Sequence, residues 1–412
     1  MKLVLTKVLP AIQSGDLAIA RAQLAALRER YPDAKITLMC RCPSQDAHWF
    51  PEADTVMPEL FPMVGESFPK RAARFVRILL GLGDDEISSG FRRTLDGANL
   101  LLFCGGGSPG GYGFGNLLLN AWCPAKMAER VGVPIVFTGL GVQSPKGRWH
   151  RMLQANVFRK ANAIAARDPL SFETLETYRT DARIECTADW AWLLPAEGQK
   201  KSLSLLANEG VTQSRRPRIG INLRNASAVG PDGKTNEDSS KTGMVILNAL
   251  VSAADQLDAE LYLFSMNRPP ASDDLEYARG LLAKNESNRI RLIMGEYSPS
   301  ELKGMIATMD IFLGTRLHPS LFAVSSGVPV VTVHEQDKVR GFMQQIGMLQ
   351  WHLPAVQLEA DAVEKKVLEL FASCDHIGQH LKEKAPGMQM AAQRNLDCIA
   401  AFVSQGVREN PA

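Results

Sequence analysis

The chain has 412 residues, of which 45% are hydrophobic and 22% are charged, a composition typical of a folded globular protein. That length accommodates two domains of ordinary size, and a net charge of +2 gives no argument for a nucleic-acid partner. No uninterrupted apolar run approaches the roughly eighteen residues that would span a bilayer. The apolar run within the first eight residues is too short for a signal peptide, so we expect a cytoplasmic protein.

The first half of the chain alternates predicted strands with predicted helices. We expect a β-α-β unit at the start of the chain, with a strand over residues 1–8, a helix from Asp16 to about Arg30 and a strand over residues 35–40. Asp16 is expected to be the N-cap of the helix, and the unit predicts a parallel sheet. Further buried strands are expected at residues 98–104, 133–138 and 163–166. We therefore expect a first doubly wound domain over residues 1–195.

A basic segment interrupts this alternation. Residues 70–80 have helical spacing, and the spacing places four basic residues largely on one side: Lys70, Arg71, Arg74 and Arg77. Two interpretations stay open for them, namely the solvated face of a helix or a docking surface for anionic lipid phosphates.

A glycine-rich segment follows the strand at residues 98–104. Gly105, Gly106 and Gly107 would let backbone amides approach a ligand closely, and the helix that follows would contribute its dipole. The spacing fits neither a Walker loop nor a Gly-x-Gly-x-x-Gly fingerprint. A merely flexible loop is the alternative.

The second half repeats the α/β pattern. Residues 196–217 are polar and are predicted to be a linker, and strands expected at residues 218–224, 260–266, 290–294 and 309–313 predict a second doubly wound domain over residues 218–374. We expect residues 375–412 to form a helix, broken at Pro386-Gly387, that packs back on the first domain.

The most informative stretch is residues 314–333. After the strand at 309–313 come a turn with Arg316 and His318, a short apolar helix with Pro319 in its first turn, and another buried strand. A helix N-terminus and a guanidinium at the carboxyl edge of an open sheet attract an anion. Arg224, at the end of the strand 218–224, would add a second guanidinium. The alternatives are a helix cap for His318 and structural ion pairs for both arginines.

Three segments carry a resemblance to a known family. Residues 316–318 (Arg-Leu-His), 327–331 and 338–342 resemble the C-terminal signature of the polysaccharide pyruvyl transferases. The resemblance covers most of the chain but is specific only around residues 314–347. It implies the GT-B architecture, in which two Rossmann-like domains face each other across a cleft and a C-terminal helix returns to the first domain.

The resemblance also implies a reaction and a site. The pyruvyl group of phosphoenolpyruvate would be transferred to two hydroxyls of a sugar with release of phosphate, without a cofactor. His318 and Arg316 would be catalytic, and the residues implied to bind substrates are Arg224, Leu317, Lys338, Asp16, Gly105, Gly106 and Gly107. No metal site is expected, because the seven scattered cysteines read as free thiols and the pair His376 and His380 lacks a third ligand.

The expected partners are phosphoenolpyruvate and a sugar or lipid-linked oligosaccharide acceptor, with peripheral association at the inner face of the membrane. The oligomeric state is not predicted. Two departures from the family pattern are Trp190, in place of a proline, and His334, in place of an aromatic residue, which implies an altered choice of acceptor. Two other functions stay open: a GT-B nucleotide-sugar glycosyltransferase, with Arg316 and Lys338 on the diphosphate and Glu335 on the ribose, and a non-catalytic carbohydrate-binding protein.

Overall fold

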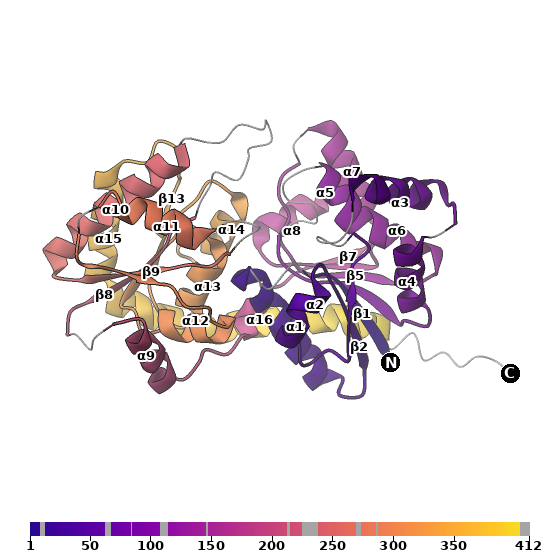
Figure 1. Ribbon diagram of the computed structural model, residues 1–412, viewed down its shortest axis with the longest axis horizontal. Coiled ribbons are helices and arrows are strands. Elements are labelled where there is room, and N and C mark those ends of the chain that lie inside the picture. The colour runs from indigo at the N-terminus through magenta and orange to yellow at the C-terminus, as the bar shows by residue number, and fades with distance from the viewer. Residues whose placement is uncertain are drawn as a thin grey trace. The chain divides into compact units, whose positions relative to one another are not determined.

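The computed structural model describes residues 1–8, 13–61, 67–83, 85–107, 114–145, 147–211, 215–224, 238–268, 273–285 and 287–403. These residues form two compact units, each built on one parallel sheet (Figure 1). The first unit takes in the described residues of Met1–Ala11, Ile19–Leu193 and Gln389–Ala412, and the second those of Ile12–Ala18 and Leu194–Met388. No helix within the described ranges is both long and apolar enough to cross a lipid bilayer.

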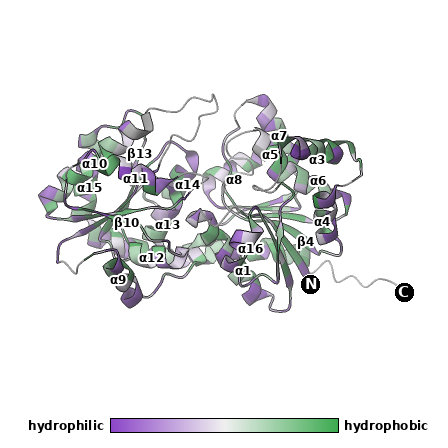
Figure 2. Ribbon diagram, in the orientation of Figure 1, coloured by the Kyte–Doolittle hydropathy of each residue, from purple (hydrophilic) through white to green (hydrophobic). Residues whose placement is uncertain are grey.

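The first unit contains a seven-stranded sheet with the order β3-β2-β1-β4-β5-β6-β7. Its strands are β1 (Lys2–Val8), β2 (Lys35–Cys40), β3 (Thr55–Pro58), β4 (Leu100–Phe103), β5 (Ile135–Leu140), β6 (Ala163–Ala166) and β7 (Arg183–Cys186). The central strands are apolar on both faces because helices cover both faces of the sheet (Figure 2). The sequence did not predict β3 and β7, which are short and partly exposed edge strands.

The helices of this unit fill the connections between strands. They are α1 (Ser14–Arg30), α2 (Pro43–Asp46), α3 (Phe68–Leu80), α4 (Glu86–Leu95), α5 (Phe114–Leu117), α6 (Cys123–Arg130), α7 (Arg148–Phe158) and α8 (Pro169–Glu176). Helix α6 packs against α3 and α4 (Figure 1). Under them lies an aromatic core in which Phe103 stacks on Phe137, with ring centroids 4.2 Å apart, and Phe158 meets Phe137 edge-on.

The second unit contains a six-stranded sheet with the order β10-β9-β8-β11-β12-β13. Its strands are β8 (Arg218–Asn222), β9 (Glu260–Phe264), β10 (Ile290–Ile293), β11 (Ile311–Gly314), β12 (Val330–Val333) and β13 (His352–Leu353). Helices α10 (Asp238–Leu257) and α15 (Ala360–Ala372) pack together on this sheet (Figure 1). The remaining connections are α11 (Asp274–Leu282), α12 (Pro299–Ile306), α13 (Leu317–Ser325) and α14 (Asp337–Gln345).

Both sheets have the same doubly wound order. In each, the chain first adds strands on one side of the first strand and then on the other, so the order reverses between β1 and β4 and again between β8 and β11. Open α/β sheets bind ligands at the carboxyl ends of the two strands on either side of such a reversal. The fold therefore directs attention to the residues that follow these four strands.

Two segments differ from expectation. The stretch expected as a linker contains helix α9 (Gln199–Asn208), which packs on α12, and the Lys303 ammonium on α12 donates to the Leu194 carbonyl at 2.7 Å. The break expected at Pro386-Gly387 is wrong, because α16 (Cys374–Val403) continues through Pro386. Buried apolar residues on both sides of Pro386, among them Leu381 and Ala392, hold the helix together despite the lost hydrogen bond.

The expected return of the C-terminal helix to the first unit is confirmed. The side-chain oxygen of Asn395 accepts from the backbone N–H of Gly139 at 2.8 Å, and its amide nitrogen donates to the Ala188 carbonyl at 2.9 Å. Asn395 is fully buried, so these bonds fix the end of α16 against the carboxyl ends of β5 and β7.

Candidate functional site

The predicted site residues of the second unit lie at the reversal between β8 and β11. The backbone N–H of Thr315, just after β11, donates to the Asn222 carbonyl at 3.1 Å, and the backbone N–H of Arg224 donates to the Thr315 hydroxyl at 2.7 Å. The two loops are thereby held side by side. Arg224 and Arg316 consequently leave neighbouring strands at the same edge of the sheet.

Arg316 is the N-cap residue of α13, and its guanidinium is bound by a buried carboxylate. Its Nε donates to Asp274 Oδ2 at 3.0 Å and its Nη2 donates to Oδ1 at 2.7 Å. Asp274 also accepts from the backbone N–H groups of Met266 and Asn267 after β9. The ion pair that we considered as an alternative role for Arg316 is therefore present. It does not exclude an anion, because a guanidinium carries five N–H donors.

His318 lies in the first turn of α13, directly against the backbone of Gly15 in the first turn of α1. A Cβ added to Gly15 would come within 2.2 Å of His318 Nδ1. The start of α1 is fixed there because the Ser14 N–H donates to the Met266 carbonyl at 3.0 Å. The expectation that Asp16 caps this helix is wrong, since α1 begins at Ser14 and Asp16 lies within its first turn, next to the glycine that contacts His318.

The N-terminus of α13 lies just after β11, at the reversal of the strand order. Leu317 is its first residue, and the N-cap residue Arg316 supplies no side-chain hydrogen bond to the amides that follow. Such amides, together with the helix dipole, favour an anion at this end.

Positive charge converges on His334, which follows β12. Arg224 Nη1 lies 3.3 Å from His334 Nε2 and 3.5 Å from Glu335 Oε1. Burial holds the pKa of His334 well below its ordinary value, and the charges of Lys338, Arg224, His352 and Arg316 lower it further. Two of these cations also have carboxylate partners, because Arg224 lies 3.5 Å from Glu335 and Arg316 pairs with Asp274.

A pocket of about 530 Å³ opens beside Arg224. Its lining includes Thr315 and Glu335 from the same edge of the sheet and the side chains of Lys241 and Tyr277. Much of the remaining lining is apolar and includes Leu223, Ile246, Val333 and Val356, so the pocket presents a few polar groups on a largely apolar wall.

The glycines of the first unit lie at the reversal between β1 and β4. Gly106 N–H donates to the Gly139 carbonyl, and a Cβ on Gly105 would come within 3.0 Å of the Trp190 ring. The Lys7 ammonium donates to the Gly107 carbonyl. The expectation that these amides face a ligand is thus wrong for Gly106, whose N–H is used within the sheet. Residues 108–113 of the glycine-rich segment lie outside the described residues.

The Arg-Asp-x-x-Ser sequence of the first unit has a structural role. Asp168 is the N-cap of α8 and accepts from both the backbone N–H and the hydroxyl of Ser171, each at 2.8 Å. Arg167 donates to Asp189 at 2.9 Å, and Asp189 in turn accepts from the Ala191 N–H. This network holds the turn that contains Trp190, where the sequence departs from the family pattern.

Two site residues were not found from the sequence. Asp274 follows Asp273 at the start of α11. Acidic residues at the start of a helix are commonly interpreted as N-caps, and Asp273 is the N-cap of this helix. Lys7 has a positive φ of 63° and lies at the end of a strand that reads as uniformly buried. The local sequence does not indicate that Asp274 pairs with Arg316 or that Lys7 donates to Gly107, because in each case the partner follows a different strand. Among the described residues, no three His, Cys, Asp or Glu side chains gather in a way that could hold a metal ion.

The polysaccharide pyruvyl transferase family model matches residues 14–334. The chain belongs to this family. The amylovoran biosynthesis protein AmsJ of Erwinia amylovora is 21% identical over 227 residues, which is 55% of this chain and 55% of that protein. The match therefore spans only about half the length of this curated relative.

Solved structures with similar folds include a protein in complex with UDP and a UDP-GlcNAc 2-epimerase. The S. aureus MnaA structure with UDP has a TM-score of 0.65 at 14% identity and covers 100% of this chain and 99% of its own. UDP-GlcNAc 2-epimerase from Neisseria meningitidis has a TM-score of 0.63 at 12% identity and covers 97% and 100%. At these identities the likeness shows the fold alone, which is GT-B.

Proposed function

We propose that this family member transfers the pyruvyl group of phosphoenolpyruvate to two hydroxyls of a sugar in a polysaccharide or lipid-linked precursor. One hydroxyl adds to C2 of the enol while a proton reaches C3, which becomes the methyl group. The second hydroxyl then displaces phosphate from C2, which closes the ketal, and its proton leaves with the phosphate. Neither step needs a cofactor.

The observation that supports this reaction best is the position of Arg224 and Arg316 on adjacent loops at one edge of the sheet, where the Arg224 N–H donates to the Thr315 hydroxyl at 2.7 Å and Arg316 is the N-cap of α13. Phosphoenolpyruvate carries a carboxylate and a phosphate, and such anions are bound by guanidiniums and helix N-termini. The start of α13 at Leu317 lies at the same edge of the sheet. His318, in the first turn of α13, is then the proton-transferring group, because an imidazole can both accept and donate a proton.

The test is an assay of the full chain with phosphoenolpyruvate and a panel of galactose- and mannose-type glycosides and lipid-linked oligosaccharides. We expect stoichiometric phosphate release and an acid-labile product that is heavier than the acceptor by one pyruvyl ketal, with and without a chelator. The same panel is run with nucleotide sugars. Release of nucleoside diphosphate, with no phosphate from phosphoenolpyruvate, would establish a glycosyltransferase instead. Sugar binding with neither product would leave a carbohydrate-binding protein.

A further inference from the structure

Helix α3 of the first unit turns its apolar side chains outward. Val76 lies three and four positions before Leu79 and Leu80, and Phe68 lies two helical turns before Val76, so these four side chains share one face of the helix. Phe68 is 82% exposed and Leu80 64% exposed, and Leu82, just beyond the helix, is also exposed. A helix on a water-exposed surface ordinarily has the opposite arrangement.

The inward side of α3 instead holds an arginine. Arg74 is only 2% exposed, its Nε donates to Asp85 Oδ2 at 2.7 Å, and its Nη1 donates to the Leu60 carbonyl at 3.0 Å. Ile78, one turn further along, is buried beside it. The sequence-based expectation that Arg74 shares a solvated face with the other basic residues is therefore wrong. The outward apolar face is fixed, because turning it inward would expose this buried ion pair and Ile78.

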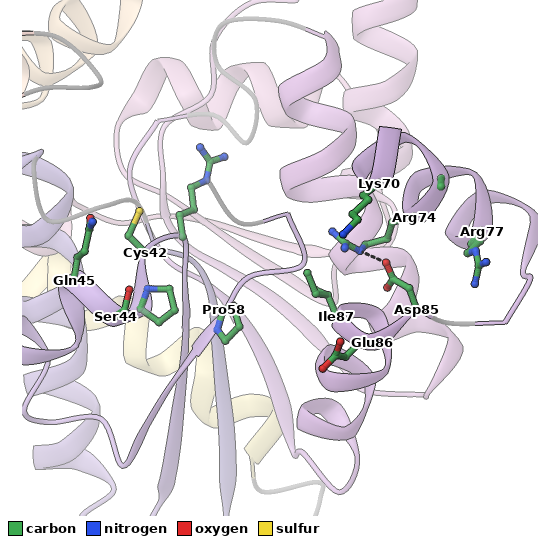
Figure 3. A pocket seen from close by; sticks show the side chains of 13 residues that line it. Cys42, Ser44, Gln45, Pro58, Lys70, Arg74, Arg77, Asp85, Glu86 and Ile87 are labelled. Carbon is green, nitrogen blue, oxygen red and sulfur yellow. Dashed lines mark hydrogen bonds and ion pairs between the residues drawn. The ribbon is translucent and has the colours of Figure 1, made fainter. Parts of the chain in front are cut away.

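Basic side chains flank the apolar face. Helix α3 contains four basic residues and no acidic one. Among the ion pairs between described residues, it contributes that of Arg74 with Asp85, and Arg77 donates to the Gly83 carbonyl at 3.3 Å. Lys70 and Arg77 line a pocket of about 630 Å³ to which Arg41 also contributes. Asp85 and Glu86 lie on the same side of this pocket as the two basic residues, and Cys42, Ser44 and Gln45 lie across it (Figure 3). Arg71 lies on a different side of the helix from Arg77, because residues on one side of a helix are three, four or seven positions apart and these two are not.

We propose that α3 is a docking helix for an anionic membrane surface. Phe68, Leu79 and Leu80 enter the boundary between headgroups and acyl chains, and Lys70, Arg71 and Arg77 bind lipid phosphates. Charge favours this occupant over a second copy of the chain, because symmetric pairing of two α3 helices would bring their basic flanks together. The inference rests on the surface of the first unit alone and does not depend on the proposed reaction.

The test is co-sedimentation of the full chain with phosphatidylcholine vesicles that contain or lack phosphatidylglycerol. We expect binding to the anionic vesicles only. The double variant Leu79→Gln/Leu80→Gln should lower that binding about tenfold or more, since it removes two leucines from the inserted face. Its matched control is Met294→Gln/Met390→Gln, because these side chains are 51% and 63% exposed against 49% and 64% for the leucines. The control should bind as the wild type does.

The charge requirement has its own pair of variants. Lys70→Glu should weaken binding to anionic vesicles, and Lys384→Glu, on an exposed part of α16, should not. Thermal unfolding of each variant checks that the fold is intact, which substitution of exposed side chains should preserve. Equal sedimentation of the leucine variant and its control would overturn the proposal, as would equal binding to neutral vesicles. A dimer that depends on Leu79 and Leu80, without vesicle binding, would assign the face to a second copy.

Discussion

Asp274 binds the edge of the Arg316 guanidinium through two hydrogen bonds, at 3.0 Å from Nε and 2.7 Å from Nη2. Asp274 also accepts from the backbone N–H groups of Met266 and Asn267, which follow β9. The loop after β9 therefore helps to fix the side chain of Arg316, which follows β11. The guanidinium is thus oriented before any donor binds, which lowers the entropic cost of binding an anion.

Loss of this orientation should weaken donor binding. We expect Asp274→Asn to raise the KM for phosphoenolpyruvate about tenfold, since an amide offers only one acceptor to a fork of two donors, and to change kcat less. Asp273→Asn is the matched control: it makes the same change one residue away, where Asp273 caps α11 through the N–H groups of Leu275 and Glu276. Asparagine caps equally well, so the control should keep its KM. Equal effects of the two variants would remove Asp274 from donor binding.

The close approach of Gly15 to His318 gives a second prediction. We expect Gly15→Ala to lower kcat roughly tenfold to a hundredfold, because the new methyl group would lie within 2.2 Å of Nδ1 and must push the imidazole aside. The measurement is phosphate release under saturating phosphoenolpyruvate and acceptor.

Gly280→Ala controls for the added methyl group. Gly280 lies within α11 and has open space where a Cβ would be, so alanine should raise the free energy of unfolding by about 0.5–1 kcal/mol and leave kcat unchanged. If Gly15→Ala kept full turnover, the position of the His318 ring would not matter for the reaction.

The sequence predicted the fold well where strands are buried on both faces. Residues 163–166 form a strand at the expected bounds, because a continuous apolar run between helices has few other interpretations. Residues 35–40, which begin with an exposed lysine and end in buried residues, also form a strand at the expected bounds. It failed at Pro386, where tertiary packing outweighs the local penalty of a proline. It also failed to orient α3, because the buried ion pair of Arg74 depends on Asp85, a partner outside the helix.

The site was predictable to a similar extent. Glycine, proline and charge around residues 314–318 mark a strand-to-helix turn, and the structure places Arg224 and Arg316 at that edge of the sheet. Contacts that depend on the spatial order of strands, such as Asp274 with Arg316, leave no local signal. The roles of these residues in donor binding and catalysis stay predictions.

His334 should make the stability of the chain depend on pH. Its Nδ1 accepts from the Gln336 N–H at 2.8 Å, and burial and nearby cations hold its pKa well below the ordinary 6.5. As pH falls below 6.5, the unfolded chain binds a proton at this residue and the folded chain does not, so stability falls with falling pH. The slope from one such group is at most about 1.4 kcal/mol per pH unit.

The measurement is urea unfolding of the wild type and of His334→Gln at pH values from about 7.5 to about 5. This range extends roughly one pH unit or more on each side of 6.5, the ordinary pKa of histidine. The variant should lose less stability than the wild type as pH falls through this window. His376→Gln, which changes an exposed histidine on α16, should keep the wild-type slope. Identical slopes for all three proteins would mean that His334 is protonated in the folded chain.

The last prediction concerns His318 itself. We expect His318→Ala to lower kcat by roughly a hundredfold or more and to change the KM for phosphoenolpyruvate less than tenfold, as loss of a general acid or base does. His376→Ala, an exposed histidine far along the chain, should change neither constant. The pH profile separates catalysis from a structural role: if His318 moves a proton, the dependence of kcat on pH should change shape in the variant. A variant that keeps the wild-type profile at reduced height would show that His318 only shapes the site.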